Sequence, residues 1–139
     1  MDISIINFNS ETKELKIASA LSSPVLIKSN DDTTIRFKGD RIPIGGSPEM
    51  FSNERSYTLD STIIKERSML YLFSDGYQDQ FGGLNDKKFM QKRFRELLKS
   101  INHFSPPKQR EHLSNEFSKW KGEYDQVDDV LVLGIELIP

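Results

Sequence analysis

The sequence predicts an α+β fold in which strands come first, two helices follow and one strand closes the chain. Short apolar segments separated by polar turns fill residues 1–75, as antiparallel strands require. Over 76–120 the apolar residues take up helical spacing, and 130–135 returns to an apolar strand. The chain has 139 residues, 36% of them apolar, which is the size of one domain or of part of one.

Four strands are expected before residue 38. They are 3–8, 14–20, 25–28 and 33–37. The polar segments 9–12 and 29–32 contain Asn, Asp and Ser, which favour turns. Apolar and polar residues alternate over 33–37, as in a half-buried strand. We expect these four strands to pair in chain order as a meander.

A loop and two further strands should follow. Gly, Pro and Ser are frequent over 39–53, so this segment is predicted to be a loop and the most mobile part of the chain. Another strand begins over 57–59. The apolar segment 68–73 is the strongest strand signal in the chain.

The first helix is predicted by one apolar stripe at spacings of three and four residues. The stripe consists of Met90, Phe94, Leu97, Leu98 and Ile101. The opposite face is basic, and its residues are Lys87, Lys88, Lys92, Arg93, Arg95 and Lys99. A solvated helix face is the favoured interpretation of these cations, and a docking surface for an acidic, phosphorylated partner is the alternative.

A second helix is predicted over 106–120. Ser105-Pro106-Pro107 has the form of an N-cap followed by Pro at the first helical position. Gly122 suits the end of this helix, and the chain then returns to a strand after Asp128.

Composition excludes several classes of function. The net charge is −2, from 19 basic and 21 acidic residues, so no global field favours nucleic acid or an anionic membrane. The absence of cysteine excludes disulfides and thiolate catalysis, and it agrees with a reducing compartment. No signal peptide or membrane-spanning segment is apparent, so a cytoplasmic location is expected.

Two acidic signatures lie at the ends of apolar strands. Ser74-Asp75-Gly76 follows one strand, and Asp128-Asp129 precedes another. A strand holds its terminal residue rigidly, so a carboxylate there can serve as a steady ligand for a hard metal ion. Asp and Gly also suit ordinary turns, and either signature alone would carry little weight. Together and in this order, they favour a metal site.

With their surroundings, these residues resemble the metal-dependent PPM (type 2C) protein serine/threonine phosphatases, and most closely the stage II sporulation protein E branch. The matched stretches are Ala18 to Leu26, Lys38 to Gly45, Leu70 to Gly83 and Val127 to Ile135. The first stretch resembles the family's Ala-Gly-Ala-Asn-Asn-Pro segment and the strand after it, and the second resembles its Pro-hydrophobic-Gly turn. The third resembles its strand followed by Ser-Asp-Gly and Asp-Gln-Phe-Gly-Gly, and the fourth resembles its closing Asp-Asp strand. One departure is Ser22-Ser23, where the family has Asn-Asn.

The resemblance implies part of an αββα sandwich and a binuclear Mn²⁺ or Mg²⁺ site. By this resemblance, Asp75 and Asp128 bind one ion from facing sheets and are the catalytic residues. Asp79 matches a position near an accessory third metal, or is simply an acid at a helix N-terminus. Gly76 and Asp129 would support the ligands without binding the metal.

The family's upstream Asp and Gly-His-Gly signature has no counterpart in the sequence. Residues 1–139 therefore resemble the C-terminal portion of the domain, without the upstream metal-binding half. Two carboxylates cannot hold two divalent ions, because each ion needs about six oxygen ligands. We expect the chain alone to be inactive or nearly so, and the parent protein to be active.

The resemblance also implies partners. It implies a phosphoserine or phosphothreonine protein substrate, often an anti-sigma-factor antagonist in this bacterial branch, and regulation by an upstream sensory region. A homodimer is a further hypothesis, because a sheet left unpaired would expose backbone and apolar surface.

Two other interpretations remain open. The chain could be a non-catalytic, phosphatase-like module that binds a phosphoprotein or a sensor segment. It could also be an unrelated mixed α/β domain, which would not respond to divalent ions.

Other motifs carry little chemistry. His103 and His112 lie on either side of the proline pair and are expected to have surface or structural roles. Asn30-Asp31-Asp32 lacks the Gly of a calcium loop and is predicted to be a turn. Gly45-Gly46 and Gly82-Gly83 are expected to permit tight turns rather than to bind phosphate. Trp120 is expected in the core.

Overall fold

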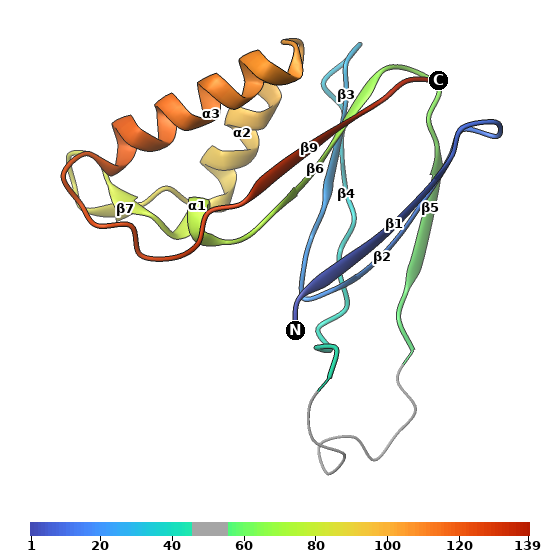
Figure 1. Cartoon of the computed structure of the whole chain (residues 1–139), viewed down its shortest axis with the longest axis horizontal. Coiled ribbons are helices and arrows are strands. Elements are labelled where there is room, and N and C mark those ends of the chain that lie inside the picture. Colours follow the sequence, from blue (N-terminus) through green and yellow to red (C-terminus); the bar gives the residue numbers. More distant parts are fainter. Residues whose placement is uncertain (46–55) are drawn as a thin grey trace. The chain divides into compact units, whose positions relative to one another are not determined.

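The structure is a computed structural model that describes residues 1–45 and 56–139 (Figure 1). The chain divides into two compact units. The first unit comprises Met1–Leu72 with Ile135–Pro139, and the second comprises Phe73–Gly134. The predicted loop over 39–53 falls partly on residues 46–55, as does Gly46, and that part lies outside the described residues.

Two antiparallel sheets make up the first unit. One has the strand order β1-β2-β5 and the other the order β4-β3-β6-β9. The strands of the first sheet are β1 (Ile3–Asn9), β2 (Glu14–Ala20) and β5 (Leu59–Ile63). Those of the second are β3 (Val25–Lys28), β4 (Thr34–Arg36), β6 (Ser68–Phe73) and β9 (Val132–Leu137), of which β6 leads into the second unit and β9 leads out of it.

The strand positions are close to the prediction, but the four-strand meander is wrong. β1 pairs with β2, and β3 pairs with β4, while β2 and β3 belong to different sheets. The chain leaves the first sheet at Leu21, whose φ is 58°, and Pro24 has no N–H to continue the ladder. The backbone N–H of Leu21 donates instead to the carbonyl of Asp40, at 2.9 Å.

Turn chemistry explains the two hairpins. The Asn9 side chain accepts hydrogen bonds from the backbone N–H groups of Glu11 and Thr12, at 2.9 and 3.0 Å, between β1 and β2. Between β3 and β4, the Asp31 carboxylate accepts from the N–H of Thr33 at 2.9 Å. These are Asx turns, and the prediction that Asn30-Asp31-Asp32 forms a turn is confirmed.

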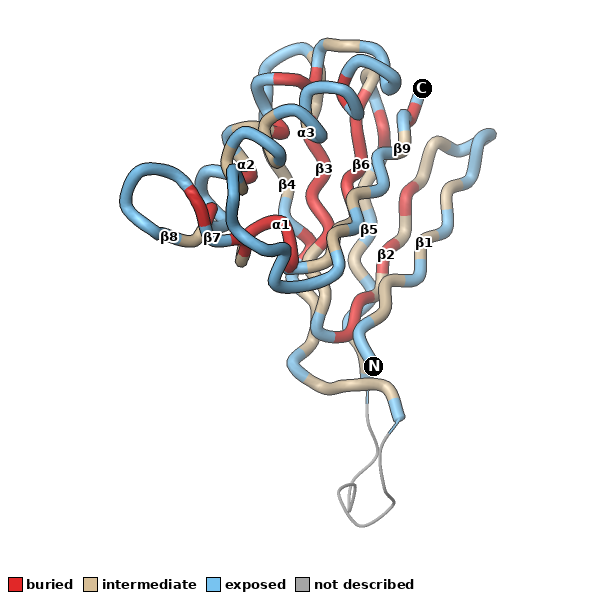
Figure 2. Tube along the Cα trace, turned by 60° about the vertical axis from the view of Figure 1, so that its left-hand side comes forward, coloured by how far each residue is buried: buried red, intermediate tan, exposed pale blue. Residues whose placement is uncertain are grey.

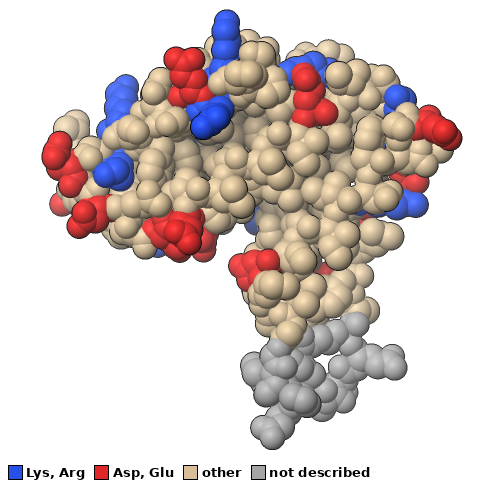
Figure 3. All heavy atoms as spheres, viewed as in Figure 1, with Lys and Arg blue, Asp and Glu red and all other residues tan. Residues whose placement is uncertain are grey.

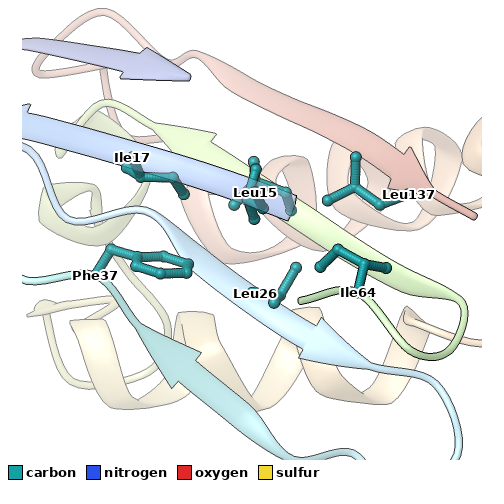
Figure 4. Close-up of a cluster of buried hydrophobic side chains, with 7 residues drawn as sticks. Leu15, Ile17, Leu26, Phe37, Ile64 and Leu137 are labelled. Carbon is teal, nitrogen blue, oxygen red and sulfur yellow. The ribbon is translucent and has the colours of Figure 1, made fainter. Parts of the chain in front are cut away.

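The core of the first unit lies between its two sheets. Leu15 and Ile17 from β2 lie in one cluster with Leu26 from β3 (Figure 4), and Leu70 from β6 belongs to the same cluster. Phe37, Ile64 and Leu137 complete this cluster. In β2 the buried residues alternate with more exposed ones, whereas β3 is almost wholly buried (Figure 2). The two patterns match a strand with one solvated face and a strand enclosed on both faces.

The second unit holds the helices. They are α1 (Gly76–Asp79), α2 (Gln91–Ile101) and α3 (Pro106–Lys121), and a short hairpin of β7 (Phe81–Gly82) and β8 (Lys87–Lys88) lies between α1 and α2. Both predicted helices are confirmed to within about a residue. Ser105 is the extended N-cap of α3, and Gly122 ends it with a φ of 53°. α1 and the β7–β8 hairpin were not predicted, because each is too short to show a period.

Aromatic side chains form the core of the second unit. Tyr77 packs against Phe89, Phe94 and Phe117, with ring centroids 4.7 to 5.1 Å apart. Phe89 meets Trp120 edge to face at 5.3 Å. The Tyr77 hydroxyl donates to the carbonyl of Leu113 at 2.9 Å, so the polar end of this buried ring is satisfied. No helix in the described part of the chain is long and apolar enough to cross a membrane.

Candidate metal centre

Asp75 lies at the start of α1, directly after β6. Its backbone carbonyl accepts hydrogen bonds from the N–H groups of Gln78 and Asp79, at 2.8 and 2.9 Å. Its side chain makes no capping hydrogen bond and is exposed to solvent. The backbone of Asp75 is thus held by the helix, while its carboxylate is left available to a ligand.

Asp128 lies in the segment that leads from α3 into β9. One oxygen of its carboxylate, Oδ1, accepts the N–H of Asp129 at 2.7 Å. Its carbonyl accepts a hydrogen bond from the Gln126 side chain at 2.8 Å. The side chain is exposed, and its second oxygen has no protein partner among the described residues.

Ser74 joins the two acidic signatures. Its hydroxyl donates to the carbonyl of Asp129 at 2.7 Å and accepts the N–H of Leu131 at 2.9 Å. Its backbone N–H donates to the carbonyl of Leu131 at 3.1 Å. One side chain therefore ties the end of β6 to the segment before β9 across 55 residues of sequence.

Gly76 allows the same close approach. A Cβ atom at this position would lie 2.4 Å from the carbonyl oxygen of Asp129 and 3.3 Å from the carbonyl carbon of Asp128. Only glycine fits against this peptide group. Gly76 and Asp129 therefore adjoin the two candidate ligands through backbone contacts.

The expectation that Asp75 and Asp128 come from facing sheets is wrong. β6 and β9 are neighbours in a single sheet, and the two aspartates lie beside the adjoining ends of these strands. Adjacent strands bring their ends together directly, so the hydrogen bonds of Ser74 are a consequence of this pairing.

Gln80 is a site-supporting residue that the sequence reasoning did not single out. It is fully buried, and its amide nitrogen donates to the carbonyl of Asp125 at 2.9 Å. Its side-chain oxygen accepts the N–H of Val127 at 3.4 Å. Gln80 thus holds the segment just before Asp128 at two points. A buried glutamine needs such partners, but a sequence does not show which residues supply them.

Asp79, the tentative third ligand, forms an ion pair. Its Oδ2 lies 2.8 Å from the Lys88 ammonium, and both side chains are roughly half exposed. Asp79 is the last residue of α1. The pair links α1 to the β7–β8 hairpin, which is a structural role that needs no metal.

The remaining candidates lie outside this arrangement. Gly82 and Gly83 approach Trp120 closely: the N–H of Gly83 donates to the Trp120 carbonyl at 3.0 Å, and a Cβ on Gly82 would lie 1.9 Å from that oxygen. The pair therefore permits a close backbone contact, besides the turn that was predicted. His103 and His112 are exposed and pack on either side of Phe104, with centroids 4.1 and 4.8 Å from its ring.

The carboxylates of Asp75 and Asp128 would suit part of a binding site for a hard divalent cation. Acidic side chains gather along the segment between α3 and β9 (Figure 3). Carboxylate oxygens are the ligands that Mg²⁺ and Mn²⁺ prefer. Within residues 1–45 and 56–139, however, no three His, Cys, Asp or Glu side chains form a group that could hold a metal ion. Asp75 and Asp128 therefore match the chemistry of such a site but not the full number of its ligands.

The fold points to the class of protein. Antiparallel sheets with few helices match the fold of solved PP2C-type phosphatase domains. The chain belongs to the stage II sporulation protein E (SpoIIE) family, which matches it over residues 1–138. The predicted resemblance and fold class are confirmed.

Solved structures support the fold. The SiaA-PP2C domain of Pseudomonas aeruginosa superposes with a TM-score of 0.83 at 24% identity, covering 96% of this chain and 50% of that chain. The phosphatase domain of the cell fate determinant SpoIIE from Bacillus subtilis superposes with a TM-score of 0.67 at 14% identity, and the match covers 99% of this chain and 59% of that chain. RsbX in complex with magnesium superposes with a TM-score of 0.55 at 16% identity, and the match covers 99% of this chain and 56% of that chain. No curated protein matches the chain.

The chain therefore spans between half and about three fifths of each of these structures. At these identities the likeness establishes the fold. The activity of the whole protein is a matter for proposal.

Proposed function

We propose that this chain is the C-terminal portion of a metal-dependent phosphatase domain that hydrolyses phosphoserine or phosphothreonine in proteins. The observation that carries the proposal is the joining of Ser74-Asp75-Gly76 to the segment that contains Asp128-Asp129, through hydrogen bonds between the Ser74 hydroxyl and the backbone of Asp129 at 2.7 Å and of Leu131 at 2.9 Å. Asp75 and Asp128 are the proposed catalytic ligands of Mn²⁺ or Mg²⁺. SpoIIE from B. subtilis was also studied after presoaking in manganese, and RsbX was solved with magnesium, which supports this choice of cofactor.

The chain's own residues would divide the work at this site. Ser74 and Gly76 hold together the two segments that carry Asp75 and Asp128. Gln80 fixes the approach to Asp128. A bound binuclear metal centre would lower the pKa of a water and neutralise charge on the phosphoryl group. Both carboxylates are exposed, which suits a site that must admit a phosphorylated segment of another protein.

We extend the proposal to the activity of the isolated chain and to its role in the cell. Two carboxylates are too few for two ions, so we propose that the chain by itself is inactive or nearly so, and that an upstream half supplies the remaining ligands. We further propose a bacterial, cytoplasmic signalling role with an anti-sigma-factor antagonist as the substrate and an upstream sensory region as the regulator. This part of the proposal rests only on the resemblance to the stage II sporulation protein E branch.

The first test is Mn²⁺-dependent hydrolysis of p-nitrophenyl phosphate by this chain and by a longer protein that begins upstream. We expect activity only in the longer protein. Asp75→Asn should lower it by about 100-fold or more, because an amide is a much weaker metal ligand than a carboxylate. Asp86→Asn removes the same charge from an exposed turn residue and should leave the rate within about twofold. Calorimetric titration with Mn²⁺ should show weaker binding in Asp75→Asn alone.

The outcomes separate the alternatives. If the longer protein folds but neither hydrolyses the substrate nor binds Mn²⁺, the chain is a phosphatase-like binding module. In that case the assignment of Asp75 and Asp128 to catalysis is wrong.

A further inference from the structure

A pocket of about 470 Å³ lies in the second unit between the β7–β8 hairpin and helices α2 and α3. No residue of the candidate metal centre lines it. Its wall combines the glycine pair of the hairpin and the Trp120 indole with the cations Lys87, Arg93 and Lys119. The pocket is thus both apolar and basic, although the net charge of the whole chain is −2.

Arg93 makes cation–π contacts with two aromatic rings. Its guanidinium carbon lies 4.2 Å from the centroid of the Trp120 ring and 4.8 Å from that of Phe89. Among the described residues, no carboxylate pairs with this guanidinium. A guanidinium in such a position can still bind a carboxylate through its N–H donors in bidentate fashion.

The other two cations are also available to a ligand. In the described part of the chain, Lys87 has no ion-pair partner. Lys119 has only a long contact with Glu116, at 4.0 Å, and its side chain is 81% exposed. Exposed pairs of this kind contribute little. Three positive groups therefore face one acidic residue around the pocket.

Leu84 adds an apolar side chain to the pocket lining. It lies in the turn between β7 and β8, with a relative exposure of 103%, and it is one of the lining residues. A fully exposed leucine beside an indole and three cations matches a peptide that carries both acidic and apolar side chains.

We propose that this pocket binds an acidic peptide segment of the phosphoprotein substrate, away from the residues that would bind metal. This inference rests on the proposed function, and it deepens that function by naming a docking site. The charge of the lining selects the acidic segment. A separate docking site would raise the local concentration of the phosphorylated residue at the metal centre. Of the cations assigned to the basic face in the sequence, Lys87 and Arg93 line the pocket, and Lys88 pairs with Asp79.

Trp120 is the only tryptophan in the chain, so its fluorescence reports directly on the pocket. The chain would be titrated with a short synthetic peptide of glutamates around a central leucine. The same peptide with lysines in place of the glutamates, and free glutamate and inorganic phosphate, are the comparison ligands. We expect a saturable change with the acidic peptide alone, with at least tenfold tighter binding than the free anions. The affinity should fall as NaCl rises from about 50 to about 300 mM.

Charge reversal tests the site itself. Lys87→Glu with Lys119→Glu should weaken binding of the acidic peptide by at least tenfold. Lys92→Glu with Lys108→Glu makes the same change in net charge at exposed helix positions outside the pocket and should cost no more than about twofold. Circular dichroism checks that both variants fold.

Three results would overturn the proposal. They are no saturable change with the acidic peptide, equal weakening by the two charge reversals, and binding of the lysine peptide as tight as that of the acidic one. The assay needs neither metal nor catalysis, so its failure is distinct from failure of the proposed phosphatase activity.

Discussion

At the scale of single residues, the Ser-Asp-Gly segment has a separate task for each member. Ser74 binds the opposite strand end through its hydroxyl, Asp75 presents a free carboxylate, and Gly76 leaves room for the Asp129 peptide group. The sequence alone explains Gly76 as a turn former. The structure shows instead that the absence of a Cβ atom allows two backbone segments to touch.

Substituting Gly76 tests this close approach. In Gly76→Ala, the new Cβ would lie 2.4 Å from a carbonyl oxygen, so the segment that carries Asp128 must shift. We expect the free energy of unfolding to fall by about 1–3 kcal/mol, which is the range for overpacking a buried position. Urea unfolding followed by circular dichroism measures it.

Ser114→Ala is the control, because Ser114 is exposed on α3. It should change the free energy of unfolding by no more than about 0.5 kcal/mol. Identical urea midpoints for Gly76→Ala and the unsubstituted chain would show that the close contact has no energetic consequence.

At the scale of elements, the helices of the second unit pack around Tyr77 in α1. Burial raises the pKa of the Tyr77 phenol above its ordinary value of 10.0, and the nearby Glu116 carboxylate acts in the same direction, while Arg93 opposes them. The folded protein therefore keeps Tyr77 protonated at a pH at which the unfolded chain loses that proton.

This difference predicts a loss of stability at alkaline pH. Below about pH 10 both states keep the proton and the contribution does not vary with pH. Above it, unfolding releases the proton, so the free energy of unfolding falls by about 1.4 kcal/mol per pH unit until the folded pKa is reached. Buried Tyr71 in the first unit adds a loss of the same sign.

Tyr77→Phe separates the two tyrosines. It removes the hydrogen bond to the Leu113 carbonyl and should lower stability at neutral pH. Between about pH 10 and 11.5, however, its free energy of unfolding should fall less steeply with pH than that of the unsubstituted chain. The reason is that unfolding of the variant releases about one proton fewer per molecule. Denaturant unfolding over this pH range measures the slope, and equal slopes would contradict the assignment.

At the scale of the whole molecule, one face of the β1-β2-β5 sheet carries an exposed apolar patch. Ile5, Ala18 and Leu59 are directly opposite one another on the three strands, and Ile5 and Leu59 are 62% and 63% exposed. Among the described strands, β1 is also at the edge of this sheet. Apolar faces and free edges of this kind favour association between copies.

We therefore expect the isolated chain to self-associate as its concentration rises. Ile5→Lys with Leu59→Lys should abolish the dimer, because two like charges would meet in the interface. Ser10→Lys with Lys65→Ala is the control, with both positions exposed and outside that face. Sedimentation equilibrium distinguishes the species. A monomer at every concentration would show that the face does not mediate association.

Local sequence patterns locate most elements of the fold and both acidic signatures. β2, β3, β6, α2 and α3 follow from local periodicity and from caps such as Ser105 and Gly122, because these signals act over a few neighbouring residues. Polar turns such as Asn9 to Thr12 are equally local, since the side chain bonds its own backbone. The same local information could not say which strands pair.

Strand pairing and the assembly of the candidate site are visible only in the folded chain. The positive φ of Leu21 sends β3 into a second sheet, and β6 lies beside β9 although more than fifty residues separate them. Ser74, Gly76 and Gln80 acquire their roles only from that pairing, because each acts on a backbone group in the segment before β9. Hydrogen bonds between segments so distant in sequence depend on the whole fold, and no local pattern encodes them.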